Sequence, residues 1–282
     1  MYTTLISAAE LKSLGLNVRI FDCSADLAKP EAGRQQFEEQ HIAGAVFADI
    51  NTDLSTHDKS LAVNGGRHPL PSREHFAQWL SANGVSNHTQ VVVYDRQGMN
   101  YCGRLWWMLK WCGHEAVAVL DGGLQAWVAE GGAVQNGPAS QAAAAHFELA
   151  APLAVLKLTT EVAESLGKPT QTIVDARAPA RYKGETEPFD PVAGHIPGAL
   201  NRPFNSNIGA DGLMKSAAVL RAEFDALLSF QEPQHVVHHC GSGISAIPNI
   251  LAMEVAGLGR TALYAGSWSE WCNTPSLPCA KA

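Results

Sequence analysis

The stretch HIPGA at residues 195–199 repeats an earlier stretch, HIAGA, at residues 41–45. Three further pairs keep the same order along the chain: IFDC (20–23) with IVDA (173–176), VVVYD (91–95) with VVHHC (236–240), and LDGG (120–123) with LYAG (263–266). Their period is far longer than the ~20–50 residues of solenoid repeats. We therefore expect a duplicated domain, with two copies of one fold.

The boundary between the copies is indicated by composition. Gly131 and Gly132 close the first copy, and residues 133–152 are rich in Ala, Gln, Gly and Pro. Such a segment is typical of a linker. We predict a first domain over residues 1–135, a linker over 136–152 and a second domain over 153–282.

Each copy alternates strand and helix patterns. Short apolar, β-branched runs at residues 18–22, 91–94 and 117–120 are typical of buried parallel strands. Ser72 and Ser216 stand where they can cap helices. The alternation predicts an α/β fold, with a parallel sheet flanked by helices in each domain. Ligands of such folds bind beyond the carboxyl ends of the strands.

Composition excludes several classes of protein. The net charge is −7, so we expect no basic face for nucleic acid. No run reaches the ~18 apolar residues of a membrane helix, and the N-terminus lacks the pattern of a signal peptide. The six cysteines are scattered without C-x-x-C spacing, unlike a disulfide framework or a zinc site. We expect a reduced cytoplasmic protein without nucleic-acid or membrane partners.

The sharpest site signal lies around Cys240. This residue ends an apolar run, and two glycines, Gly241 and Gly243, precede a helical pattern at 247–255. The glycines allow a tight loop whose N–H groups turn inward, and the helix start adds unpaired N–H groups. Such a loop favours a thiolate or persulfide anion. A cysteine buried only for packing is the alternative, but the junction of strand, loop and helix favours a reactive thiol.

Together these motifs resemble the two-domain rhodanese and 3-mercaptopyruvate sulfurtransferase superfamily. The resemblance covers nearly the whole chain and includes CGSGISA (240–246), both HI-x-GA stretches, DGG (121–123) and GSWSEW (266–271). It implies two tandem rhodanese-like domains, of which only the second is catalytic. Arg96 follows the first-domain run 91–95 in place of a cysteine. The implied active loop consists of the catalytic Cys240 followed by an anion cradle of Gly241, Ser242, Gly243, Ile244 and Ser245.

The resemblance also implies a chemistry. A sulfurtransferase would take sulfane sulfur from a small anionic donor, 3-mercaptopyruvate or thiosulfate, and hold it as a Cys240 persulfide. A thiol, cyanide or a thioredoxin-like protein would then accept the sulfur. This is covalent catalysis by a transferase of sulfur-containing groups. It needs no metal site and no cofactor, because the transferred atom is carried by the enzyme.

Three residues outside the loop are implied as site residues. Arg181 matches a donor-binding arginine, which can grip a carboxylate through two parallel hydrogen bonds. His68 matches a histidine that binds the substrate and, with Ser242, could move protons. Asn51 stands in line with the family's aspartate, so Asp53 is a possible member of this relay.

Two clues about the donor conflict. The mercaptopyruvate branch often has an arginine after a Glu-Pro pair, whereas Phe189 follows that pair here. The thiosulfate branch often has Arg and Lys in the active loop, and this loop has neither. The donor therefore stays open between the two.

Two other functions compete with this interpretation. Phosphatases with a Cys-x5-Arg loop need an arginine at position 246, where the chain has Ala246. A non-catalytic sulfur carrier or interaction module of rhodanese fold is the main alternative. The intact cysteine loop favours the enzyme.

Overall fold

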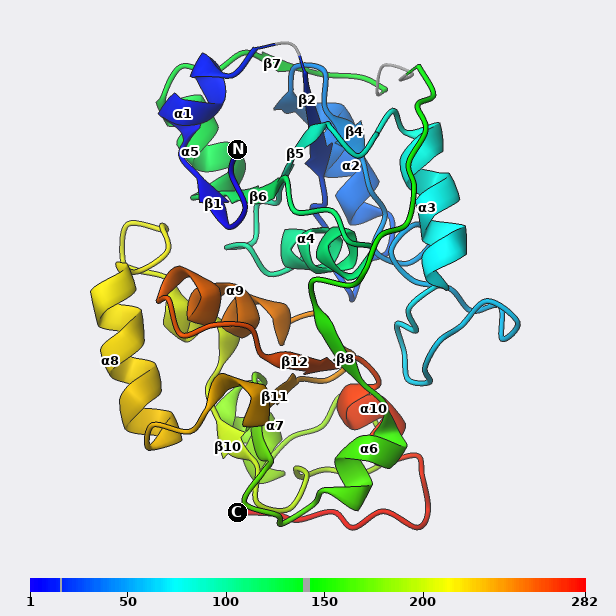
Figure 1. Ribbon diagram of the computed structural model, residues 1–282, viewed down its shortest axis with the longest axis vertical. Helices are drawn as coiled ribbons and strands as arrows, with labels where there is room; N and C mark the ends of the chain where they lie inside the picture. Colours follow the sequence, from blue (N-terminus) through cyan, green and yellow to red (C-terminus); the bar gives the residue numbers. More distant parts are fainter. Residues whose placement is uncertain (16, 139–142) are drawn as a thin grey trace. The chain divides into compact units, whose positions relative to one another are not determined.

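The structure is a computed structural model that describes residues 1–15, 17–138 and 143–282 (Figure 1). It forms two compact units. The first unit comprises Met1–Leu61, Pro71–Leu153 and Ala210–Met214, and the second comprises Ala62–Leu70, Ala154–Gly209 and Lys215–Ala282. Residues 62–70, from the first half of the chain, thus belong to the second unit, and residues 210–214, from the second half, belong to the first unit.

The predicted linker is only partly covered by this description, because residues 139–142 lie outside the described residues. The rest of it belongs to the first unit. Ala145 donates its N–H to the carbonyl of Ser81, and the side chain of Phe147 is buried.

The first unit contains a five-stranded parallel sheet in the order β1-β6-β5-β2-β4. Its strands are β1 (Leu5–Ile6), β2 (Val18–Asp22), β4 (Val46–Phe47), β5 (Gln90–Tyr94) and β6 (Val117–Leu120). Its helices are α1 (Ala8–Ser13), α2 (Ala32–Glu39), α3 (Arg73–Ala82), α4 (Cys102–Trp111) and α5 (Gly123–Ala129). A separate antiparallel pair joins β3 (His41–Ile42) to β7 (Val134–Gln135).

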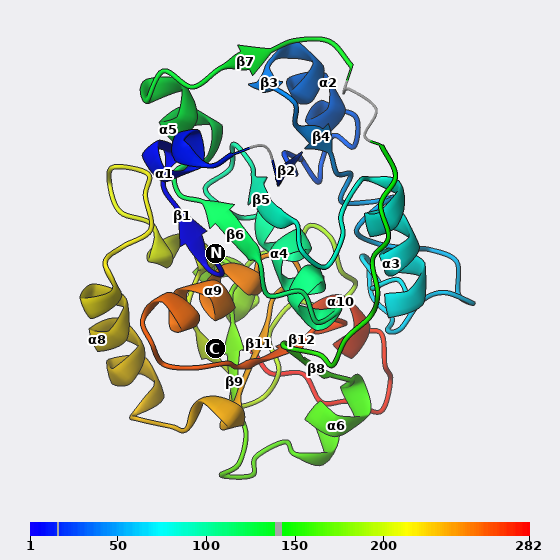
Figure 2. The same cartoon turned by 45° about the horizontal axis from the view of Figure 1, so that its top comes forward.

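The second unit repeats this topology, with a parallel sheet in the order β10-β9-β11-β12-β8. Its strands are β8 (Val155–Lys157), β9 (Thr172–Asp175), β10 (Leu200–Asn201), β11 (Val236–His239) and β12 (Ala262–Tyr264). Its helices are α6 (Thr159–Glu164), α7 (Pro179–Lys183), α8 (Ala217–Leu228), α9 (Ile247–Val255) and α10 (Ser267–Trp271), with 3-10 turns η1 (Phe204–Asn207) and η2 (Pro233–His235). Helices α8 and α9 lie to one side of this sheet and α6 and α10 to the other (Figure 2).

The predicted fold class is confirmed, because both sheets are parallel and flanked by helices. The predicted caps are also present: the side chains of Ser72 and Ser216 accept the N–H groups of His75 and Val219. Within the described residues, no helix has the length and apolar character needed to cross a membrane.

Candidate active site

Cys240 directly follows β11, the central strand of the second sheet. The loop that begins at Cys240 leads to α9 at Ile247. Because β9 and β12 pair with β11 on either side, the loop leaves the sheet at the middle of its carboxyl edge. This is the edge at which parallel α/β sheets bind ligands.

Helix α10 holds this loop in place. The hydroxyl of Ser267 accepts the N–H of Cys240 at 3.1 Å and donates to the carbonyl of Tyr264 at 2.9 Å. The carbonyls of Cys240 and Gly241 accept the N–H groups of Trp268 and Ser269. Ser267 has a φ of 56°, which is uncommon for a residue with a side chain. The start of the loop is therefore fixed by hydrogen bonds to the GSWSEW stretch, two of them with its backbone and one with the Ser267 hydroxyl.

The two loop glycines are constrained differently. Gly243 has a φ of 76°, and a Cβ there would lie 2.2 Å from the carbonyl oxygen of Ala265. The atoms nearest to a Cβ at Gly241 belong to side chains, Nη2 of Arg67 at 3.0 Å and Nη1 of Arg181 at 3.2 Å. Two guanidinium groups thus lie against the residue that follows the cysteine.

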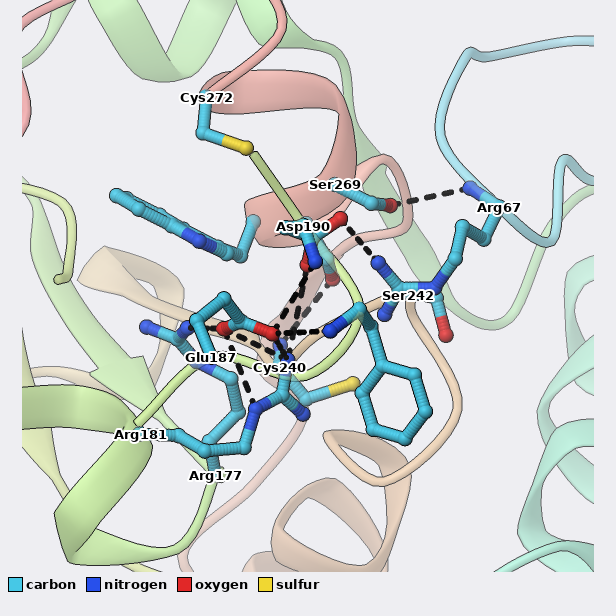
Figure 3. Close-up of polar contacts among 12 residues, drawn as sticks. Arg67, Arg177, Arg181, Glu187, Asp190, Cys240, Ser242, Ser269 and Cys272 are labelled. Carbon is cyan, nitrogen blue, oxygen red and sulfur yellow. Dashed lines mark hydrogen bonds and ion pairs between the residues drawn. The ribbon is translucent and has the colours of Figure 1, made fainter. Parts of the chain in front are cut away.

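Asp190 contacts both of these arginines (Figure 3), and the ring of Phe189 packs against both. Asp190 forms an ion pair with Nη1 of Arg67 and lies 3.6 Å from Nη2 of Arg181. The ring of Phe189 has the Cζ atoms of Arg181 and Arg67 at 5.1 and 5.4 Å from its centroid. Glu187 accepts two hydrogen bonds from Nη2 of Arg181, at 2.7 and 2.9 Å.

Arg177 has a structural role by comparison. Its side chain is 1% exposed and binds Asp175 at 2.6 Å and the carbonyl of Gly194 at 2.7 Å. Its guanidinium also lies 4.8 Å from the ring centroid of Trp268. Burial alone would raise the pKa of Asp175, but His239 and Arg177 beside it bring that pKa below its usual value.

The structure brings His68 and Ser242 together. Their Nδ1 and Oγ atoms lie 2.8 Å apart, and both residues are buried. This contact lies within the second unit, to which residues 62–70 belong. Asp53, the possible relay residue, belongs to the first unit, where its carboxylate accepts the N–H of Asp49 and where burial raises its pKa.

Cys240 is only 2% exposed. Its surroundings are nevertheless charged, since the guanidinium groups of Arg67 and Arg181 lie against the next residue. The two histidines before it are buried in the core: His238 contacts the sulfur of Met253, and His239 faces the carbonyl of Cys240. Burial lowers the pKa of His238 to about 3, so this residue is neutral at physiological pH.

The equivalent loop of the first unit holds a carboxylate. Tyr94 pairs with Asp22 in the first sheet, and His239 pairs with Asp175 in the second. Asp22 and Asp175 are equivalent residues of the two copies. The residue that corresponds to Cys240 is therefore Asp95 and not Arg96. The interpretation of Arg96 as the counterpart of the cysteine is therefore wrong by one residue. Four backbone N–H groups point at the Asp95 carboxylate at 2.7–3.0 Å, those of Gln97, Met99, Tyr101 and Cys102.

Sequence reasoning missed the residues that connect the site. Asp190, Ser267 and Ser269 were not predicted. Ser267 and Ser269 lie in a stretch that the resemblance includes, so they had a weak signal. No sequence signal pointed to Asp190, because its contact with Arg67 joins residues far apart in the chain.

The fold and the site together define a class, an α/β protein with a cysteine after the central strand of a parallel sheet. The chain belongs to the rhodanese family: the model of the rhodanese-like domain matches residues 7–130 and again residues 158–274. The predicted family is therefore confirmed.

The relatives are sulfurtransferases of both donor types. A protein from Pseudomonas aeruginosa named "Probable 3-mercaptopyruvate sulfurtransferase" is 41% identical over 262 residues, covering 93% of this chain and 91% of the relative. The thiosulfate sulfurtransferase of Cricetulus griseus is 35% identical, with coverage of 96% and 92%. The 3-mercaptopyruvate sulfurtransferase structure from Leishmania major has a TM-score of 0.80 and 30% identity, covering 96% of this chain and 74% of that one. The prediction of a sulfurtransferase enzyme is confirmed.

Proposed function

We propose that this protein moves sulfane sulfur from 3-mercaptopyruvate or thiosulfate to a thiol, cyanide or thioredoxin-like acceptor, through a persulfide on Cys240. The observation that supports this most is the position of Cys240 at the end of the central strand, in a loop bordered by Arg67 and Arg181. We place this reaction in the cytoplasm.

The two donors require different first steps. With 3-mercaptopyruvate, the Cys240 thiolate attacks the donor sulfur, the C–S bond breaks, and its electron pair forms the enolate of pyruvate. The S–H proton of the donor moves to that enolate carbon, so pyruvate leaves and Cys240 carries S–S⁻. With thiosulfate, the S–S bond breaks and sulfite leaves with the electron pair, and no proton moves.

A proton carrier therefore matters for only one of these donors. The hydrogen-bonded pair of His68 and Ser242 is suited to pass the proton from sulfur to carbon. In the second half-reaction an acceptor thiolate attacks the outer sulfur of the persulfide, and the Cys240 thiolate leaves.

The loop amides supply the stabilisation of the anion. We infer this from the first unit, whose equivalent loop has the same length and surrounds the Asp95 carboxylate with N–H groups. Gly98 and Gly243 have similar left-handed φ values, 69° and 76°. The N–H groups of Ser242 and Ile244 correspond to those of Gln97 and Met99. A persulfide on Cys240 would take the place of the carboxylate.

Intact-protein mass spectrometry tests the proposal. After treatment with 3-mercaptopyruvate or thiosulfate the protein should gain one sulfur atom, and a thiol should then remove it. The Cys240→Ser variant should gain none, while Cys279→Ser, which removes an exposed thiol, should gain sulfur like the wild type. No gain with either donor would contradict the enzyme and favour a non-catalytic interaction module.

A further inference from the structure

The carbonyl of Cys240 has two polar partners, and one of them is the side chain of the residue before it. Trp268 donates its backbone N–H to this oxygen at 3.1 Å, and Nδ1 of His239 lies 3.1 Å from it. Because a carbonyl oxygen can only accept, the ring carries a proton on Nδ1. Burial lowers the pKa of His239, so the ring is neutral at pH 7 and Nε2 holds no proton.

The other end of this ring faces strand β9. Nε2 of His239 lies 3.6 Å from Oδ2 of Asp175, and in the described part of the chain it has no hydrogen-bond partner. Asp175 is itself bound by Arg177 at 2.6 Å. His239 is fully buried, and a polar nitrogen buried without a partner is unfavourable. Packing alone therefore does not explain a histidine at this position, whereas the contact at Nδ1 does.

The contact at Nδ1 also orients the next peptide group. In a trans peptide the C=O and N–H groups point in opposite directions. The Cys240 carbonyl points at His239 and Trp268, so the N–H of Gly241 points away from both. Gly241 is buried, and within residues 1–15, 17–138 and 143–282 no group accepts this N–H. Since buried N–H groups without a partner are rare, this donor is available to an anion at position 240.

We propose that His239 is a positioning residue for sulfur transfer: its Nδ1–H fixes the Cys240–Gly241 peptide so that the N–H of Gly241 is directed at the Cys240 thiolate and persulfide. This inference rests on the proposed function and adds a residue to it. His239 touches neither the donor nor the reacting sulfur. Its removal should therefore change the rate and the pH profile of persulfide formation more than KM for either donor.

Amide side chains distinguish the two ring nitrogens. Asparagine can place an N–H donor near the position of Nδ1, whereas glutamine reaches toward that of Nε2. We expect His239→Gln and His239→Leu to slow single-turnover persulfide formation roughly three- to ten-fold with both donors, the value of one hydrogen bond. The half-maximal rate should also move to higher pH. His239→Asn should restore most of the rate and the wild-type pH profile.

The matched control is His238→Asn. His238 is the neighbouring histidine and is equally buried, but its ring lies on the opposite face of the strand and contacts Met253. We expect this variant to form the persulfide at the wild-type rate and with the wild-type pH profile.

Long-range ¹H–¹⁵N NMR of the wild type tests the hydrogen bond without any kinetic measurement. At pH 7 the ring of His239, assigned by the loss of its signals in His239→Asn or His239→Gln, should be the neutral tautomer with its proton on Nδ1. A proton on Nε2 alone would overturn the proposal, even where a variant folds poorly.

The outcomes separate this inference from the proposed function. If the wild type forms the persulfide but His239→Gln and His239→Leu do so equally fast, or His239→Asn is no better than they are, the positioning role is overturned and the sulfurtransferase stands. If the wild type forms no persulfide with either donor, both are overturned, because no anion then forms at position 240.

Discussion

Gly241 and Gly243 are two residues apart, yet the structure constrains them in different ways. Adding a Cβ at Gly243 meets the backbone of Ala265, which cannot move out of the way as a side chain can. Because the φ of Gly243 is also positive, we expect Gly243→Ala to lower the free energy of unfolding by at least about 2 kcal/mol.

The matched control for this prediction is Gly198→Ala. Gly198 has a similar φ of 78° but no atom within 4 Å of the added Cβ, so only about 1 kcal/mol of backbone strain is expected. Urea unfolding of both variants provides the comparison. Equal losses would mean that the contact with Ala265 does not matter.

His68 gives a second prediction at the scale of one residue. His68→Gln removes the proton carrier but keeps a polar group near Ser242. We expect kcat with 3-mercaptopyruvate to fall roughly hundred-fold, and kcat with thiosulfate to change little. Single-turnover formation of the Cys240 persulfide from each donor measures this effect. A similar loss with both donors would show that His68 does not act through proton transfer.

At the scale of elements, helix α10 carries the loop through Ser267. Removing its hydroxyl leaves the N–H of Cys240 without its partner, at a cost of about 1–3 kcal/mol. We expect Ser267→Ala to lower both stability and kcat. Ser267→Gly should lower kcat similarly but cost less stability, because glycine relieves the positive φ. Urea unfolding and kcat of both variants check this. A normal kcat in Ser267→Ala would show that the loop does not depend on this bond.

Most of the elements could be predicted from local patterns. The caps at Ser72 and Ser216, and the helix over 247–255, follow from residue types that favour them within a few positions. The meeting of Arg67 and Asp190 could not be predicted in this way, because no local propensity couples loops so far apart in the chain. The prediction that His68 and Arg181 belong to the site came only from the family resemblance, which carries tertiary information that periodicity lacks.

At the scale of the whole molecule, buried histidines make stability depend on pH. Burial lowers the pKa of His238 to about 3, whereas an unfolded chain titrates histidine near 6.5. Below about pH 6.5 the unfolded state therefore binds a proton at His238 more readily than the folded state does. The contribution of His238 is fully present above that pH and is lost progressively as the pH falls toward 3, by up to about 1.4 kcal/mol per pH unit.

Urea unfolding at pH 7 and pH 5 tests this contribution. We expect His238→Leu to reduce the loss of stability between these two conditions, and His146→Gln, which alters an exposed histidine, to leave it unchanged. An unchanged pH dependence in His238→Leu would mean that other groups account for acid sensitivity.

The membership of residues 62–70 in the second unit has an evolutionary consequence. After a gene duplication, a copy without a thiol is normally free to decay or be deleted. Here the copy whose loop carries Asp95 where the other has Cys240 also encodes His68, which contacts Ser242 within the second unit. Under the proposed function, selection on the codon of His68 would preserve the first copy as an obligate companion of the second.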